Sequence, residues 1–307
     1  MTISVDSPLF SVVIPTYNRP QRLSQCLNSL IRQSLSNFHW EVIVVDDGSY
    51  ESIEPVVQTF KSQIQIRLIR QPNAGPASAR NTGAAAAQGD YLVFTDDDCQ
   101  PHSDWLKTLA EAIKDFPNTL IGGHTINALP QNLYSSASQL LIDYIYDYYN
   151  QQKGEATFFA SNNFGLPREL YQKLGGFDTS FPLAAGEDRE FCDRWLQYGN
   201  KMLYAPEVQV YHAHKLTLSS YWRQHFQYGR GAFCFHQIRA KRAHTEIKVE
   251  PISFYLNLLK YPLTQSTTQP KLLLSALLFV SQLAGVLGFF WERNHQTSNA
   301  TLRGTRK

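Results

Sequence analysis

Apolar runs of four to six residues alternate with longer amphipathic runs through residues 9–116. Strands are expected at residues 9–14, 40–45, 64–69 and 91–94. Helices are expected between and after them, at residues 21–33, 52–60, 77–88 and 104–116. Short strands that are apolar along their whole length are typical of a parallel sheet with helices on both faces. The alternation therefore predicts an α/β fold with a mostly parallel central sheet.

A polar cluster follows the end of each expected strand. The four clusters are Thr16–Arg19, Asp46–Gly48, Gln71–Gly75 and Asp96–Asp98. Ligands of open α/β sheets bind at this edge, outside the carboxyl ends of the strands. The sequence contains neither a GxGxxG fingerprint after the first strand nor a GxxxxGK[ST] phosphate loop, which disfavours dinucleotide-dependent oxidoreductases and P-loop phosphotransferases.

The cluster Asp96-Asp97-Asp98 carries three consecutive carboxylates at the end of the strand expected at 91–94. Adjacent carboxylates repel one another unless a cation lies among them, and a divalent metal is the cation that takes oxygen ligands at this density. A solvated acidic turn is the alternative interpretation. The triplet is therefore a candidate metal site.

A second acidic segment, Gly186–Glu190, begins an amphipathic helix expected at 187–198. The helix dipole stabilises the ionised form of a carboxylate in the first turn, and an ionised Asp188 could take a proton from an attacking hydroxyl. An ordinary capping carboxylate is the alternative. A metal-bound diphosphate together with such a base describes transfer from an activated nucleotide donor to a hydroxyl.

Two histidines, His212 and His214, follow short strands expected at 201–204 and 208–211. Strand alternation places both on one face, and imidazole suits Mn²⁺ better than Mg²⁺. They are candidate metal ligands, although a structural role is the alternative for each.

The last eighty residues differ in charge and hydropathy. Residues 226–307 carry eleven Lys or Arg against three Glu, a net charge of +8, which leaves −6 on residues 1–225. Residues 272–291 contain no charge, and a helix of about 20 residues reaches the thickness of the hydrocarbon core of a bilayer. Lys271 and Trp291 at its ends favour membrane contact; a buried helix of a soluble fold is the alternative. Spanning the bilayer and lying in one leaflet both stay open.

The membrane is the anionic partner that this basic and apolar region predicts, in preference to nucleic acid. The first residues contain no basic segment followed by an apolar one, so no signal peptide is expected. The four cysteines form no CxxC pair, which indicates reduced thiols in a cytosolic setting.

Six motifs in order resemble the family 2 glycosyltransferases with the GT-A fold. They are Val12–Arg19, Val44–Ser49, Asn73–Gly83, Phe94–Asp98, Gly175–Asp178 and Gly186–Asp188. Each motif alone is weak, but their order makes the signal specific over residues 9 to about 215. The QxxRW motif of the processive synthases is not found in the sequence; Gln224–Gly231 occupies roughly that region and resembles non-processive members.

The resemblance implies a donor site for a nucleotide-diphospho-sugar. Pro15 and Tyr17 fall where the family lines the base, and Asp47 falls where a carboxylate contacts the base. Arg80 matches a position that contacts the nucleotide, and Asp96 matches the first carboxylate of the DxD motif, towards the ribose.

The resemblance also implies the metal site and the base. Asp98 matches the last carboxylate of the DxD motif, which ligates Mn²⁺ or Mg²⁺, with Asp97 as the spacer. His212 resembles a distal histidine that touches metal or phosphate, and His214 is the weaker candidate. Asp188 matches the catalytic base of inverting members.

These inferences predict a GT-A catalytic domain at 1–225 and a C-terminal helical, membrane-associating region at 226–307. The expected enzyme is an inverting, metal-dependent glycosyltransferase at the cytoplasmic face of the plasma membrane. It would move one sugar to a lipid-linked acceptor or a cell-surface glycan. A sugar-phosphate nucleotidyltransferase and a non-catalytic nucleotide-sugar-binding protein are the alternatives.

Overall fold

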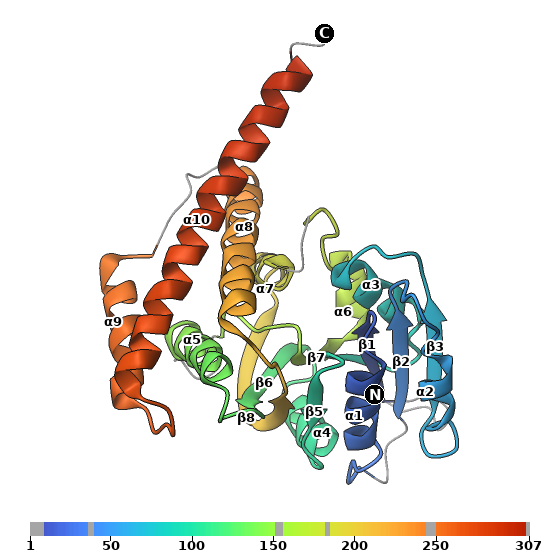
Figure 1. Ribbon diagram of the computed structural model, residues 1–307. Helices are drawn as coiled ribbons and strands as arrows, with labels where there is room; N and C mark the ends of the chain where they lie inside the picture. The colour runs from blue at the N-terminus through green and yellow to red at the C-terminus, as the bar shows by residue number, and fades with distance from the viewer. Residues whose placement is uncertain (1–8, 36–39, 151–155, 182–184, 244–249, 305–307) are drawn as a thin grey trace. The chain divides into compact units, whose positions relative to one another are not determined.

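The computed structural model describes residues 9–35, 40–150, 156–181, 185–243 and 250–304, and the residues on which the signal-peptide prediction rests lie outside these ranges (Figure 1). The chain divides into two compact units. The first comprises residues 1–128, 149–179 and 191–213, and the second comprises 129–148, 180–190 and 214–307. The predicted division into domains at residue 225 stays a prediction.

The described strands of the first unit form one eight-stranded sheet in the order β3-β2-β1-β4-β7-β6-β8-β5. Their bounds are β1 Phe10–Thr16, β2 Trp40–Asp46, β3 Ile66–Arg70, β4 Tyr91–Thr95, β5 Cys99–Pro101, β6 Thr119–Asn127, β7 Asn163–Pro167 and β8 Lys201–His212. The half formed by β3, β2, β1 and β4 is parallel, as predicted. The other half is mixed, because β7 runs antiparallel to β4 and β6, and β5 runs antiparallel to β8.

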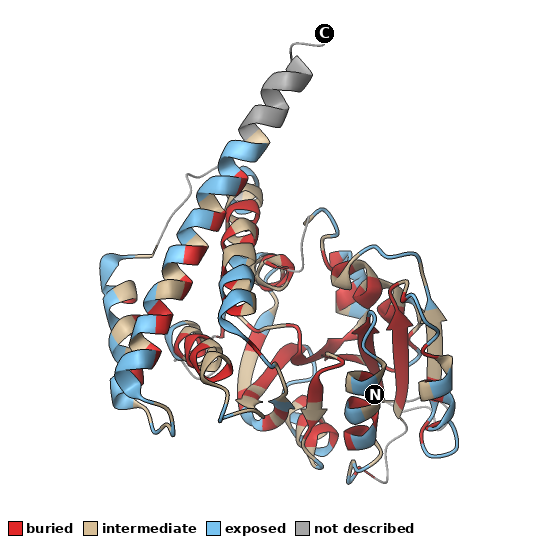
Figure 2. Cartoon of the chain, in the orientation of Figure 1, coloured by how far each residue is buried: buried red, intermediate tan, exposed pale blue. Residues whose placement is uncertain are grey.

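Helices cover both faces of the parallel half. In the first unit they are α1 Pro20–Leu30, α2 Glu54–Gln58, α3 Pro76–Ala86, α4 Trp105–Asp115 and α6 Arg168–Leu174. Val12, Val42 and their neighbours point to one face and form a core with α1, α2 and α4. Val13 points to the opposite face and meets Gly83 of α3, where an added Cβ would lie 2.4 Å from Val13 Cγ1. Strands β1, β2 and β4 are almost wholly buried, whereas the edge strand β3 is only partly buried (Figure 2).

Strand β8 is one strand of twelve residues where the sequence predicts two short strands. Its parallel register with β6 shifts between Gly123 and His124, opposite the segment that contains Pro206. The glycine makes this irregularity possible, since an added Cβ on Gly123 would lie 2.0 Å from the carbonyl oxygen of Val208. Proline interrupts the apolar pattern but not the strand, and β8 therefore runs unbroken to His212.

Helix α7, Glu187–Gln197, connects the two units, and the remaining helices form the second one. These helices are α5 Leu133–Tyr149, α8 Leu218–Ala243, α9 Ile252–Thr264 and α10 Lys271–Gly304. Tyr144 of α5 packs on Phe254 of α9 with ring centroids 5.1 Å apart, and its hydroxyl donates to the Phe254 carbonyl at 2.8 Å.

The helix predicted at 272–291 is part of the longer α10. Among the described residues, one helix, Lys271–Gln296, is long and apolar enough to cross a membrane by length and composition. A third of its most apolar window is buried within the protein. Burial on one side therefore distinguishes α10 from a helix that is surrounded by lipid.

Gly229→Ala is expected to lower the free energy of unfolding by about 1–3 kcal/mol. An added Cβ on Gly229 would lie 1.9 Å from the carbonyl oxygen of Gly285, so α8 and α10 would have to move apart. Gly285→Ala is the matched control, because its Cβ would meet only the His225 carbonyl oxygen at 3.8 Å and alanine favours a helix. Urea unfolding followed by circular dichroism measures both variants, and equal midpoints would contradict this close contact.

Candidate functional site

Each of the three carboxylates after β4 has cationic or polar partners in the first unit, and Asp97 and Asp98 share Arg19. Asp96 Oδ1 lies 2.6 Å from Nη2 of Arg80, which comes from α3. The Arg80 side chain is 5% exposed, and its guanidinium lies 5.7 Å from the ring centroid of Phe177. A buried guanidinium is thus held at the triplet, which places the predicted residues Arg80 and Asp96 in direct contact.

Asp97 points into the protein and does more than separate its two neighbours. Its carboxylate accepts hydrogen bonds from Thr16 Oγ1 at 2.7 Å and from Arg19 Nη1 at 3.2 Å. Burial raises the pKa of Asp97 to about 6, against the lowering effect of the Arg19 charge. Asp97 therefore ties the end of β4 to the loop that follows β1.

Asp98 is the carboxylate on which most cations converge. Its Oδ2 lies 2.9 Å from Arg22 Nη1 and 3.6 Å from Arg19 Nη1, and its Oδ1 lies 3.2 Å from His212 Nε2. Backbone pairing fixes His212 there, because Cys99 of β5 is its register partner and the Ala213 amide donates to the Asp98 carbonyl at 2.9 Å. The structure brings together the two predicted metal ligands.

The chemistry of this donor set fits a divalent cation. A carboxylate oxygen and an imidazole nitrogen suit Mn²⁺, and Asp98 and His212 belong to a group of side chains that could hold a metal ion. Burial disfavours the imidazolium of His212, but the hydrogen bond and the charge of Asp98 outweigh it and raise the pKa of His212. A metal at this position requires the neutral imidazole, with Nε2 as the donor atom.

Asp47 organises the loop that follows β3. Its carboxylate accepts from Gln71 Nε2 at 2.7 Å and from the amides of Ala74 and Gly75 at 2.9 and 2.8 Å. The adjoining Gly48 has a φ of +83°, and an added Cβ there would lie 2.8 Å from the Asn73 amide nitrogen. Asp47 therefore fixes the rim of the site, and its predicted contact with a base stays a prediction.

The two remaining donor-site candidates lie at the end of β1. Pro15 is buried and pairs in register with Val45, next to the loop that carries Asp47. Tyr17 is 37% exposed, and its ring centroid is 6.1 Å from that of Tyr50. Two aromatic rings at a strand end offer apolar faces on which a planar base can stack.

Asp188 and His214 belong to the second unit. Asp188 lies in the first turn of α7, as predicted, and its Oδ1 accepts from the Arg189 amide at 2.8 Å. Glu190, in the same turn, is buried and forms an ion pair with Arg242 of α8 at 2.7 Å. The roles predicted for Asp188 and His214 stay predictions.

Two residues that contact the triplet, Arg19 and Arg22, were not among the predicted site residues. Arg19 belongs to the polar cluster after β1, so its position at the sheet edge carried a signal. Arg22 lies inside α1, where a surface arginine is ordinary, and no local pattern points to it.

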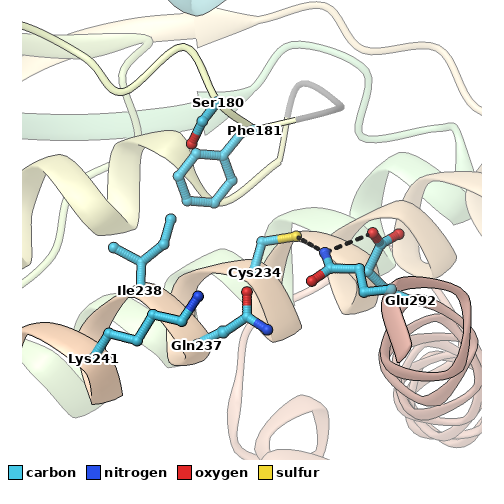
Figure 3. A pocket seen from close by; sticks show the side chains of 8 residues that line it. Ser180, Phe181, Cys234, Gln237, Ile238, Lys241 and Glu292 are labelled. Carbon is cyan, nitrogen blue, oxygen red and sulfur yellow. Dashed lines mark hydrogen bonds between the residues drawn. The ribbon is translucent and has the colours of Figure 1, made fainter. Parts of the chain in front are cut away.

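A pocket of about 380 Å³ lies in the second unit, and none of its lining residues is a predicted site residue. It is lined by Ser180, Phe181, Cys234, Gln237, Ile238, Lys241, Glu292 and Gln296 (Figure 3). Its polar groups partly satisfy one another, since Gln296 Nε2 donates to Glu292 Oε1 at 2.9 Å and to Cys234 Sγ at 3.4 Å.

Comparison with known proteins decides the family. The model of "Glycosyl transferase family 2" matches residues 11–175, which is more than half of the chain and includes Pro15, Asp47 and the acidic triplet. The chain belongs to glycosyl transferase family 2. The predicted resemblance and the class of enzyme, a glycosyltransferase, are thereby confirmed.

Relatives with assigned names are glycosyltransferases. The chain is 30% identical over 235 residues to hyaluronan synthase of Pasteurella multocida, covering 66% of this chain and 24% of the relative. It is 26% identical over 232 residues to the glycosyltransferase AglE of Haloferax volcanii, covering 73% of each. The chain therefore spans only about a quarter of the first relative's length.

A solved structure shows the same fold. The mannosyltransferase PcManGT of Pyrobaculum calidifontis, in complex with GDP-Man and Mn²⁺, superposes with a TM-score of 0.60 at 19% identity. The match covers 97% of this chain and 81% of that one. The predicted GT-A fold of this glycosyltransferase is confirmed.

Proposed function

We propose that this glycosyltransferase moves one sugar from a nucleotide-diphospho-sugar to an acceptor hydroxyl, with inversion at the anomeric carbon. The observation that carries the proposal is the contact of Asp98 with His212, beside the pair of Asp96 with Arg80, at one edge of the sheet. PcManGT binds the sugar donor GDP-Man together with Mn²⁺. This complex supports a nucleotide-diphospho-sugar donor and a divalent metal for the present enzyme.

The donor would lie along the carboxyl ends of the parallel strands. Tyr17 offers a face for the base, Arg80 offers its charge to the nucleotide, and Asp96 offers a hydrogen-bond acceptor to the ribose. Asp98 and His212 would hold Mn²⁺ or Mg²⁺, which neutralises charge on the diphosphate as it leaves. The carboxylates alone would repel the diphosphate, so binding of the donor depends on these cations.

The acceptor would be activated by Asp188. Its carboxylate takes the proton of the acceptor hydroxyl, and the hydroxyl oxygen forms a bond to the anomeric carbon. The bond from that carbon to the diphosphate oxygen breaks on the opposite side, and the nucleoside diphosphate leaves with the electron pair. One displacement inverts the configuration, by the same logic as in inverting glycosidases.

The acceptor proposed here is a lipid-linked or cell-surface glycan at the cytoplasmic face of the plasma membrane. Two observations support it: the apolar helix Lys271–Gln296 and the net charge of +8 on residues 226–307. The synthase names of relatives such as hyaluronan synthase support a role in polysaccharide synthesis.

Incubation with UDP-, GDP- and dTDP-sugars is expected to give hydrolysis or transfer with at least one donor. Removal of divalent metal with EDTA should abolish turnover, and Mn²⁺ or Mg²⁺ should restore it, because Asp98 and His212 alone leave the diphosphate charge uncompensated. Released nucleoside diphosphate is the measured quantity. The absence of both turnover and metal-dependent nucleotide binding would contradict the proposed sugar transfer. Turnover that persists in EDTA would contradict only the proposed metal dependence.

A further inference from the structure

Helix α10 has one face buried in the second unit and, over residues 272–290, an exposed apolar face. Leu274 and Leu278 are buried in apolar clusters with residues of α5, α8 and α9, and Ala284 is buried as well. The opposite face, here called the outer stripe, consists of Leu272, Phe279, Leu283, Val286, Leu287 and Phe290, which are 44–77% exposed. Figure 2 shows the buried side of α10 turned to α8 and the exposed side turned away. Separations of three, four and seven residues place the members of the stripe on one side of the helix.

Specific polar contacts hold the inner face of α10 to α8. The Tyr221 hydroxyl donates to the Leu277 carbonyl at 3.0 Å. Arg230 Nε lies 2.7 Å from Glu292 Oε2, with both side chains largely buried, and its guanidinium lies 4.2 Å from the Trp291 ring centroid. The helices also approach closely at Gly229 and Gly285. Helices α8 and α10 are therefore packed together as a pair.

The contacts between α8 and α10 limit the orientations that α10 can adopt in a bilayer. If α10 crossed the bilayer alone, it would lose α8, and Glu292 at the end of the apolar segment would lose its Arg230 partner. If α8 crossed with it, Arg223 and Arg239, both exposed on α8, would enter the hydrocarbon core. Charges at that depth are costly. The first arrangement breaks contacts of the folded unit, and the second places charges in hydrocarbon at high cost.

We propose that α10 lies parallel to the membrane plane, with the outer stripe inserted into the headgroup boundary of an anionic lipid surface. Because α8 and α9 cover its inner face, α10 offers a single apolar face to lipid, and one apolar face flanked by basic residues suits this layer. The basic residues are on the chain: exposed Lys271 and Arg293 bracket the stripe, and residues 226–307 carry a net charge of +8. The proposal concerns where the enzyme is held and stands apart from the proposed sugar transfer.

Charge also disfavours a second copy of the chain as the occupant of the outer stripe. Two stripes that pack antiparallel would bring Lys271 of one copy next to Arg293 of the other. Parallel packing would bring Lys271 next to Lys271 of the second copy, and Arg293 next to Arg293. Both arrangements place like charges together, whereas an anionic lipid surface attracts all of them.

Flotation of the full-length chain with lipid vesicles tests the inference without any substrate. We expect it to float with vesicles of phosphatidylcholine and phosphatidylglycerol, and to bind neutral phosphatidylcholine on the order of tenfold more weakly. Phe279→Glu places a charge in the middle of the stripe and should reduce binding roughly tenfold or more. Phe116→Glu, at a 47% exposed phenylalanine in the first unit, is the matched control and should float like the parent chain.

Orientation is tested by protease digestion of a C-terminally tagged chain added to the outside of sealed vesicles. A helix in the membrane plane leaves the tag accessible, and the tag should be removed completely. A protected tag would overturn the proposal in favour of a spanning helix. The proposal would also be overturned if the Phe279→Glu variant floated as well as the parent chain. A third contradicting result is a parent chain that does not float and forms a dimer in solution, with Phe279→Glu dissociating that dimer.

Discussion

Asp98→Asn is expected to reduce sugar transfer by roughly 10³-fold. A metal that polarises a phosphoryl oxygen supplies several kcal/mol of transition-state stabilisation, and each 1.36 kcal/mol is a factor of about ten. The amide keeps the shape of the side chain and one oxygen that can accept from Arg22, now 2.9 Å from Asp98. It removes the negative charge that holds a divalent cation next to His212, so the loss should fall on catalysis and not on folding.

Initial rates at saturating donor across a Mn²⁺ titration measure this effect. The variant should need a higher Mn²⁺ concentration for its residual rate, while its unfolding midpoint stays near that of the parent. Asp115→Asn, an exposed aspartate at the end of α4, is the matched control and should leave the rate unchanged. A full rate at the parent's Mn²⁺ requirement would show that Asp98 is not a metal ligand.

The parallel half of the sheet could be predicted from the sequence because its signal is local. β1, β2 and β4 are apolar along nearly their whole length, and each ends in a polar cluster, so their bounds followed from composition. β6 was not predicted, since Gly122, Gly123 and the polar residues Thr125 and Asn127 interrupt its apolar pattern. Its place depends on pairing with β7 and β8, which are remote in sequence.

The candidate site shows the same division. The carboxylates of the triplet are adjacent in sequence and could be recognised from it. Their partners come from other elements: Thr16 from β1, Arg22 from α1, Arg80 from α3 and His212 from β8. A guanidinium directed at a carboxylate from another helix leaves no local pattern, and Arg22 was missed for this reason.

The two faces of α10 could not be distinguished from the sequence. Residues 272–291 are free of charge all round, so periodicity does not separate the inner face from the outer stripe. The difference arises from packing: Gly229 of α8 and Gly288 of α10 allow the two helices to approach closely, and an added Cβ on Gly288 would lie 2.0 Å from the Phe226 carbonyl oxygen. Packing contacts, and not composition, thus cover one apolar face of α10 and leave the other exposed.

Asp188→Asn is expected to lower kcat by roughly 10²–10⁴-fold, the usual contribution of a positioned general base. The variant keeps an oxygen that can accept from the Arg189 amide, so the first turn of α7 should stay formed. Affinity for the nucleotide-sugar, measured by titration calorimetry with Mn²⁺, should be nearly unchanged, because the proposed donor residues lie on other elements. The matched control is Asp193→Asn on the same helix, whose carboxylate accepts from Gln197 Nε2 at 3.1 Å.

The pair of measurements separates the base from the capping carboxylate that the sequence leaves as the alternative. If Asp188 only caps the helix, its replacement by asparagine should change the free energy of unfolding little, because asparagine is itself a good cap. The change in kcat should then be small as well. A base lost to asparagine leaves binding and folding intact and removes the acceptor of the proton, so kcat falls alone. If donor affinity falls together with kcat, Asp188 contacts the donor and the acceptor hydroxyl is activated by another residue.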